Sequence, residues 1–301
     1  MGSTKFTAHN IRLDDGTYTI PDEQYSIDKL PWFISARRIL NIAFPENKNS
    51  YRLADLGCLE GGYAVEFARM GFQVVGIDIR DANIAACNYV KSKTNLSNLT
   101  FVKDNALNIE KYGLFDAIFC SGLLYHLDNP KEFLRILSAV TKKVLILNTH
   151  FSTTDQGKVW PDIIRKLLMM MKKSVSSVTK FSLSRLTDNE NLRGRWYIEY
   201  PNDAAFRNRE KSRKASWDNR RSFWIQREYL LQTIYDVGFD LVLEQFDIFA
   251  PNIAEDILKG YYRINSRGVF IGIKTPPAEV EHSQPEKSDL VFLSPTQQSL
   301  Q

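Results

Sequence analysis

A glycine-rich loop that carries two carboxylates is the strongest chemical signal in the sequence. It reads D-L-G-C-L-E-G-G over residues 55–62 and follows an apolar run, where a first strand would turn into a first helix. Glycines at such a turn let the backbone come close to a ligand. The spacing G-x-x-x-G-G differs from the dinucleotide pattern G-x-G-x-x-G, and Asp55 and Glu60 would each repel a nearby pyrophosphate by about 1 kcal/mol or more. The loop therefore favours a ligand with positive charge.

Acids also follow the next two apolar runs of the chain. Asp78 ends the second run, 21 residues after Gly57, where a carboxylate can accept hydrogen bonds from both hydroxyls of a ribose. Asp104 and Asn105 end the third run, where they could meet the amino group of an adenine. A sulfonium, an ammonium group and a ribose without phosphate occur together in S-adenosylmethionine. The acids therefore predict an adenosyl pocket that takes S-adenosylmethionine in preference to NAD.

Two histidines offer a base. His126 lies in G-L-L-Y-H-L after the fourth apolar run, and His150 ends the fifth. A neutral imidazole can take the proton of a hydroxyl group while that oxygen is alkylated. We expect His150 to be the base, because it borders the insertion that follows, and His126 to lie closer to the cofactor. The alternatives are a packing role for His126 and a cap on the strand end for His150.

A metal site is the less favoured use of these histidines. It would combine them with Asp128 or Glu199, but the spacing matches no familiar zinc or iron pattern. We therefore predict no metal.

The elements that must position these residues alternate between strands and helices. Strand-like runs occupy residues 52–58, 72–79, 99–105, 115–122 and 143–150, with helical patterns between them. Near-continuous apolar strands separated by helices indicate a parallel sheet covered on both faces. The runs at 239–246 and 267–275 would complete it. The fold class predicted is α/β, with a doubly wound, mostly parallel seven-stranded sheet.

The segments outside this alternation define the expected domain organisation. We expect an N-terminal helical extension at 1–50 with an amphipathic run at 34–43, a cofactor-binding core at 51–150, and an inserted substrate lid at 151–226. The insertion is far longer than an ordinary loop, which favours a folded subdomain with its own role. Residues 227–276 would complete the core. Residues 277–301, rich in Pro, Ser, Gln and Glu, are predicted to be disordered.

The predicted lid is dense in aromatic and basic side chains. We expect it to bind the acceptor rather than the cofactor, through Trp196, Tyr197, Glu199, Trp217, Asn219 and Trp224. Packing onto the core domain is the alternative role for most of the aromatic residues. Seven basic residues against two acidic ones lie between Arg207 and Arg221. They could bind a phosphate, a carboxylate or tRNA, or form a solvated face.

Composition excludes several classes of protein. Of 301 residues, 44% are hydrophobic and 25% are charged, which is typical of a globular chain. No apolar run approaches the ~18–20 residues of a membrane span, and the N-terminus lacks a signal-peptide pattern. Cys58, Cys87 and Cys120 form no CxxC pair and no disulfide framework. A net charge of +4 is too small to imply nucleic acid. We expect a soluble, cytoplasmic protein; its oligomeric state stays open.

Four motifs in order give the chain a family resemblance. D-L-G-C-x-E-G-G, G-I-D, K-D-N-A and C-S-G-L-L-Y-H-L together resemble class I S-adenosylmethionine-dependent methyltransferases over residues 50–150. The stretch G-L-L-Y-H-L-D-N-P is also similar to bacterial enzymes that modify the tRNA wobble uridine and to methyltransferases of natural-product and glycan pathways. The resemblance implies a Rossmann-like fold and a cofactor site made by Asp55, Gly57, Cys58, Glu60, Gly61, Asp78, Ile79, Asp104, Asn105, Ala106, Ser121 and Gly122.

The function that follows is transfer of a methyl group from S-adenosylmethionine to a small acceptor, with an oxygen atom of a natural product or glycan preferred. S-adenosylhomocysteine would be the product. Two alternatives stay open: a tRNA wobble-uridine modification enzyme, and a cofactor-binding partner subunit without catalysis.

Overall fold

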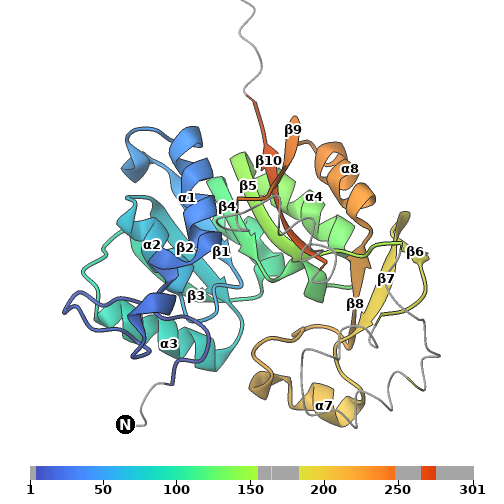
Figure 1. The fold of residues 1–301 in the computed structure, drawn as a ribbon, viewed down its shortest axis with the longest axis horizontal. Helices are drawn as coiled ribbons and strands as arrows, with labels where there is room; N and C mark the ends of the chain where they lie inside the picture. Colours follow the sequence, from blue (N-terminus) through green and yellow to red (C-terminus); the bar gives the residue numbers. More distant parts are fainter. Residues whose placement is uncertain (1–4, 155–163, 165–182, 248–265, 276–301) are drawn as a thin grey trace, which may run out of the picture.

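The computed structural model describes residues 5–154, 164, 183–247 and 266–275. At its centre is a seven-stranded sheet in the order β3-β2-β1-β4-β5-β10-β9 (Figure 1). The strands are β1 (Arg52–Leu56), β2 (Gln73–Asp78), β3 (Leu99–Lys103), β4 (Phe115–Ser121), β5 (Thr141–His150), β9 (Leu241–Gln245) and β10 (Arg267–Ile273). Neighbouring strands are parallel except at β10, which runs antiparallel to both β5 and β9. The predicted α/β fold class is confirmed.

Two apolar cores cover the two faces of this sheet. Successive residues of a strand point to opposite faces, so β4 contributes Ala117 and Phe119 to one core and Ile118 and Cys120 to the other. Helices α1 (Pro31–Ala43), α2 (Gly62–Arg69) and α3 (Asp81–Ser92) place buried side chains in the first core, and α4 (Pro130–Val140) and α8 (Arg227–Asp236) in the second. Both faces of the sheet are covered by helices, as the apolar strands require.

Short helices occupy several of the connections. The 3₁₀ helices are η1 (Glu23–Tyr25), η2 (Ile27–Lys29), η3 (Lys48–Ser50), η4 (Ala106–Tyr112), η5 (Leu124–His126) and η7 (Arg209–Lys211). The N-terminal segment also belongs to the fold, because Ile11, Leu13 and Ile27 are buried in the first core. The amphipathic run predicted at 34–43 forms α1, which begins three residues earlier because Pro31 suits the first turn of a helix.

The order of the strands decides where a ligand can bind. The chain passes from β1 outward to β2 and β3, then returns to place β4 on the other side of β1. Loops that leave β1 and β4 therefore diverge, and a crevice opens between them at the carboxyl edge. The glycine loop and the segment with His126 border this crevice.

The described part of the inserted segment forms a second, small sheet. Its antiparallel strands are β6 (Thr187–Asn189), β7 (Leu192–Ile198) and β8 (Arg221–Ile225), and the β7–β8 connection includes α7 (Asp203–Arg207) (Figure 1). Its apolar side chains belong to the second core, together with those of α4 and α8. The Phe223 N–H donates to the Leu127 carbonyl at 2.8 Å, and the Ser152 N–H to the Ile225 carbonyl at 2.8 Å. The insertion is therefore packed against the main sheet.

Some sequence expectations fall outside the described residues. The predicted disordered tail at 277–301 lies wholly outside them, and so does much of the first part of the insertion. The domain boundaries stay predictions. No helix among the residues that the structure describes is long and apolar enough to cross a bilayer.

Candidate active site

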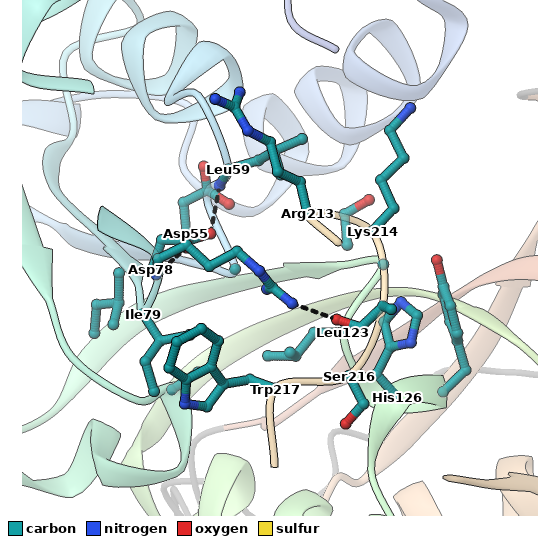
Figure 2. Close-up of a pocket in the computed structure, with 18 of the residues that line it drawn as sticks. Asp55, Leu59, Asp78, Ile79, Leu123, His126, Arg213, Lys214, Ser216 and Trp217 are labelled. Atoms are coloured by element: carbon teal, nitrogen blue, oxygen red, sulfur yellow. Dashed lines mark hydrogen bonds between the residues drawn. The ribbon is translucent and has the colours of Figure 1, made fainter. Parts of the chain in front are cut away.

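A cavity of about 490 Å³ lies at the crevice between β1 and β4. Its walls come from the ends of β1, β2 and β4, from the N-terminal segment, from η4 and η5, and from residues 213–218 of the insertion. Figure 2 shows Asp55, Asp78 and the Trp217 ring on one side of it and Ser216 and His126 on the other. Segments far apart in sequence thus share one site. The predicted cofactor residues that line it are Asp55, Gly57, Asp78, Ile79, Asn105, Ala106, Ser121 and Gly122.

The glycine loop can turn here because two of its glycines take left-handed backbone angles. Gly57 has φ +69° and lines the cavity, so its backbone forms part of the cavity wall. Gly61 has φ +83° and caps the N-terminus of α2, and a Cβ on it would lie 2.6 Å from the Phe101 ring. It is not part of the cavity lining. Its role is to let α2 start beside β3, which corrects the expected cofactor contact.

Asp55 is a buried carboxylate at the end of β1. Its side chain is in the cavity lining, and among the described residues Oδ2 has no hydrogen-bond partner. Burial raises the pKa of Asp55 to about 8, against a smaller opposite effect of the Ala64 N–H bond. An unpaired acid in a cavity suits a ligand group that can donate hydrogen bonds or carries positive charge.

Because its pKa is raised, Asp55 makes the free energy of unfolding depend on pH. Folded protein binds this proton more tightly than unfolded protein does, so the free energy of unfolding falls as pH rises from 3.8 towards about 8. We expect Asp55→Asn to remove this slope, so that the variant gains about 1 kcal/mol relative to the wild type between pH 6 and pH 7. Urea unfolding of both proteins at the two pH values measures the difference. If the free energy of unfolding changes equally with pH in the two proteins, the pKa of Asp55 is not raised.

Asp78 ends β2 with both carboxylate oxygens engaged. Oδ2 accepts from the Leu59 N–H at 3.0 Å, and Oδ1 accepts from the Arg80 N–H at 2.9 Å and from the Asn83 side chain at 3.0 Å. Burial raises its pKa, and these three donors oppose the rise. The carboxylate is therefore held in one orientation at the cavity wall, as a hydroxyl-binding group must be.

Arg80 was missed by the sequence analysis and connects the core to the insertion. Its guanidinium donates through Nη2 to the carbonyls of Ser212 and Ala215, at 3.1 and 2.6 Å, and its Cζ lies 5.4 Å from the Trp217 ring centroid. These bonds hold the loop 212–217 over the site. The insertion therefore shares a wall with the strand-end acids, and the expectation that it binds the acceptor rather than the cofactor stays a prediction. The D-I-R sequence after β2 was the available signal.

Loss of Arg80 should loosen this loop. Two hydrogen bonds from a charged donor contribute about 1.5 kcal/mol or more, so Arg80→Gln is expected to speed amide hydrogen exchange of residues 209–217 by about tenfold. Mass spectrometry of the exchanged peptides measures this. Arg135→Gln, on the exposed face of α4, is the matched loss of charge and should leave these peptides unchanged. Equal exchange in Arg80→Gln and wild type would show that other contacts hold the loop.

Glu60 does not face the cavity. Its side chain is fully buried and accepts hydrogen bonds from the backbone N–H groups of Thr7, Ala8 and His9. It also forms an ion pair with Arg213 at 2.9 Å. Despite burial, the backbone donors hold the pKa of Glu60 below its ordinary value. The expectation that its charge attracts the cofactor is corrected: Glu60 joins the N-terminal segment and the insertion to the glycine loop.

Two other predicted cofactor residues also lie outside the cavity lining. The Cys58 thiol is buried 3.9 Å from Cys87 Sγ, and burial raises its pKa well above the ordinary value. The Asp104 carboxylate accepts from the Asn105 N–H, the Asn108 side chain and the Tyr112 hydroxyl, so it stabilises its own turn. Asp104 follows β3 as predicted, but donors of its own turn bind its carboxylate.

The Asn105 side chain remains at the cavity with Ala106. Its Oδ1 accepts from the Leu107 N–H and its Nδ2 donates to Asp218 Oδ1 at 3.0 Å. This second bond again fastens the insertion to a strand end. Together Asn105, Ala106 and Leu107 offer a half-apolar wall that suits a flat ring.

His126 is the histidine that lies in the cavity wall beside a carboxylate. Its Nδ1 is 2.8 Å from Glu199 Oε1, and the Glu199 side chain is only 2% exposed. Glu199 is itself oriented, because Ser222 Oγ donates to Oε1 at 2.7 Å and the Ser216 N–H donates to Oε2 at 3.1 Å. A carboxylate at Nδ1 fixes the tautomer with the proton there and leaves Nε2 able to accept a proton.

His150 is not among the residues that line the cavity. Its ring stacks on Trp224 with centroids 4.7 Å apart and meets the Tyr125 ring edge-on at 4.6 Å, and Nδ1 lies 3.2 Å from the Ser266 carbonyl. This position favours His126 over His150 as the base. Both histidines lie at the carboxyl edge of the sheet, but packing against aromatic rings holds His150 outside the cavity lining.

Most of the predicted acceptor residues pack within the insertion. Trp224 Nε1 donates to the Tyr125 carbonyl, and Tyr197 stacks on Trp224 at 4.9 Å. Asn219 supports η5 by donating to the His126 carbonyl at 2.8 Å. Of the six predicted acceptor residues, Trp217 is the one in the cavity lining; Trp196, Tyr197, Glu199, Asn219 and Trp224 are not in it. The packing alternative thus describes most of the aromatic side chains.

One part of the cavity wall is aromatic and basic. Trp32, Tyr63, Tyr125 and Arg267 line it, from α1, α2, η5 and β10. None of these was predicted, because the four lie in different elements and no local motif joins them. Within the described residues, no group of three His, Cys, Asp or Glu side chains is placed to hold a metal ion.

Comparison with known proteins places this geometry in a family. A domain profile described as a methyltransferase domain matches residues 47–216, which is more than half of the chain. A presumed methyltransferase of Geobacillus sp. (strain WCH70) is 30% identical over 118 residues, 38% of this chain and 47% of that protein. A ubiquinone biosynthesis O-methyltransferase of Rickettsia typhi is 21% identical over 132 residues, 43% of this chain and 53% of that protein. The chain spans about half the length of the curated relatives it matches.

Solved structures show the same fold. The N-terminal domain of EvdMO1 with S-adenosylhomocysteine bound superposes with a TM-score of 0.58 at 17% identity, over 91% of this chain and 100% of that one. The same domain crystallised in the presence of S-adenosylhomocysteine and D-fucose gives a TM-score of 0.56 at 18% identity, over 87% and 88%.

Proposed function

Because the chain belongs to the class I S-adenosylmethionine-dependent methyltransferases, we propose that it transfers a methyl group to a hydroxyl oxygen of a small acceptor, with His126 as the base. The observation that carries this proposal is the His126–Glu199 pair, 2.8 Å apart, in the wall of the cavity that also holds Asp55 and Asp78.

The cavity residues fit the cofactor group by group. Asp78 would accept from the ribose hydroxyls, and Asn105, Ala106 and Leu107 would border the adenine. Asp55, buried and with Oδ2 unpartnered among the described residues, would meet the ammonium group. The bound cofactor supplies an electrophilic methyl group on a sulfonium. This role would account for the carboxylate of Asp55 beside the glycine loop, where a dinucleotide site would need none.

His126 would hold the proton that the acceptor loses. With Nδ1–H donating to Glu199, the free Nε2 accepts the hydroxyl proton, and the carboxylate then stabilises the imidazolium. Glu199 is thus a positioning residue. Because methyl transfer needs the two reacting atoms aligned, the loop 212–217 that closes over the site would contribute by excluding water and fixing the acceptor.

The acceptor is proposed to be a small molecule, a natural product or a sugar. Two relatives or neighbours support this class by name: a ubiquinone biosynthesis O-methyltransferase and a domain crystallised in the presence of D-fucose. A cavity of about 490 Å³ for cofactor and acceptor together also favours a small acceptor.

A tRNA acceptor is the weaker alternative because much of the basic run is used within the fold. Arg213 pairs with Glu60, Arg220 with Asp203, and Arg221 lies over the Trp196 ring at 4.2 Å. Arg209 packs on the Trp217 ring at 4.7 Å. Side chains held this way offer few free charges to a phosphate backbone.

Two measurements test the proposal. Calorimetry should show binding of S-adenosylhomocysteine and none of NAD. Labelled methyl transfer into separate pools of small hydroxylated metabolites and of tRNA should mark the first pool. NAD binding without S-adenosylhomocysteine binding would overturn the cofactor, and label in tRNA would overturn the acceptor. Tight S-adenosylhomocysteine binding without transfer to either pool would support a non-catalytic partner subunit.

A further inference from the structure

We propose that the acceptor carries a carboxylate and that Arg267 binds it, so that the acceptor hydroxyl is presented to His126. The inference rests on the proposed methyl transfer and names its substrate class: a hydroxy acid.

The guanidinium of Arg267 is held in place at the cavity. The residue opens β10, opposite His150 of β5, and its Nε donates to Asn148 Oδ1 at 2.7 Å. Asn148 is 2% exposed, so this anchor is itself buried. Nη2 lies 3.8 Å from the place that a Cβ on Gly122 would occupy, which puts the far edge of the guanidinium beside the end of β4. An anchored Nε leaves the two Nη groups as a fork for a carboxylate.

The walls around this fork are aromatic. Arg267 Cζ lies 5.5 Å from the Trp32 ring centroid and 5.8 Å from that of Tyr125, and Tyr63 completes the lining. Rings reduce the hydration of the guanidinium and hold its plane, so an ion pair formed there is stronger than one at the surface. Burial raises the pKa of Tyr63 to about 12 and raises that of Tyr125, and the charge of Arg267 opposes both rises. Both phenol groups therefore lie within the field of this cation.

The charge of Arg267 has no partner acid in the part of the chain that the structure describes. Arg213 also lines this cavity, but its charge is paired with Glu60 at 2.9 Å. For Arg267 the described contacts are one amide oxygen and two rings. A cation that is fixed, half-buried and without a counterion in a ligand cavity is the expected receptor for an anionic group of the ligand.

One aromatic ring borders both the base and the guanidinium. Tyr125 borders both groups: its ring centroid is 4.3 Å from that of His126 and 5.8 Å from Arg267 Cζ. A molecule with its hydroxyl at His126 and its carboxylate at Arg267 would therefore lie across one aromatic ring. Hydroxybenzoic acids and uronic acids, in which one six-membered ring carries both groups, belong to this class and serve as probes.

The first experiment measures substrate preference. Labelled methyl transfer is assayed with 3- and 4-hydroxybenzoate, glucuronate and the amide of each, using wild type, Arg267→Gln and Arg267→Lys. We expect the wild type to prefer a carboxylate over its amide by about 10- to 100-fold in kcat/KM, the range for a hydrogen-bonded charge. Arg267→Gln should lose the preference and Arg267→Lys should keep part of it. The exposed Arg135→Gln is the matched control and should behave as wild type. Equal use of acid and amide by the wild type would overturn the proposal.

The second experiment separates the acceptor from the cofactor, whose amino acid portion also has a carboxylate. Calorimetry with S-adenosylhomocysteine and with its decarboxylated analogue should give Kd values for Arg267→Gln within about threefold of wild type. If Arg267→Gln weakens S-adenosylhomocysteine more than tenfold but leaves the decarboxylated analogue unchanged, Arg267 binds the cofactor and the proposal is wrong.

The same calorimetry distinguishes failure of the proposed function. The hydroxy acids are titrated into the S-adenosylhomocysteine complex. If they bind in an Arg267-dependent way but no acceptor is methylated, the anion site stands and the catalytic proposal fails. If neither acid nor amide binds while S-adenosylmethionine-dependent transfer to another, neutral acceptor is found, the function stands and the hydroxy-acid class is excluded.

Discussion

Replacing His126 by alanine is expected to lower kcat by about 10²- to 10⁴-fold, the usual contribution of a general base. The Kd for S-adenosylhomocysteine should stay within about threefold, because the described contacts of the His126 ring are with Glu199 and Tyr125 rather than with the strand-end acids. Single-turnover methyl transfer, monitored with labelled cofactor, measures the chemical step directly.

Two variants make this result specific. His150→Ala, which removes a ring packed on Trp224 outside the cavity lining, should keep more than a third of wild-type kcat. Glu199→Gln keeps the size of the side chain but removes the charge that stabilises the imidazolium, so it should show an intermediate loss with little change in KM.

The reciprocal result would contradict the assignment of the base. If His126→Ala retains wild-type kcat while His150→Ala loses it, His150 is the base and the expectation from the sequence was right.

Asp78→Asn is expected to weaken S-adenosylhomocysteine binding by about 1.5–3 kcal/mol, or roughly 10- to 150-fold in Kd. The carboxylate is anchored by Leu59, Arg80 and Asn83, so in the proposed site it would accept from the ribose hydroxyls with little cost of ordering. An amide presents one acceptor oxygen in place of two. Calorimetry measures the Kd, and circular dichroism checks that the variant is folded.

Asp104→Asn provides the matched control. It is the same substitution at the end of the neighbouring strand, but its carboxylate is bonded to Asn105, Asn108 and Tyr112 outside the cavity lining. Its Kd should change less than threefold. Equal weakening by both variants would mean that charge at the sheet edge, and not contact with the ribose, determines affinity.

The sheet and the location of the site follow from the sequence alone. Apolar runs such as F-D-A-I-F-C predict buried parallel strands because both faces of such strands are covered, and β4 has this pattern of burial. The acids at 55 and 78 and Gly57 reached the cavity because the carboxyl ends of adjacent parallel strands lie at one edge. In each case the deciding information lies within a few residues along the chain.

Only the tertiary structure decided which strand-end groups face the ligand. Asp104 and Glu60 had the right type and position, but donors from the local turn and from the N-terminal segment already hold them. His126 lies in η5, shortly after β4, and His150 ends β5, so both are at the carboxyl edge of the sheet. A carboxylate 73 residues away orients the first, and aromatic rings hold the second beside the cavity. Arg267 lies far along the chain from every motif and reaches the site because β10 inserts next to β5. A side chain in a loop points where its hydrogen bonds and packing direct it, and those partners come from distant segments that no local periodicity encodes.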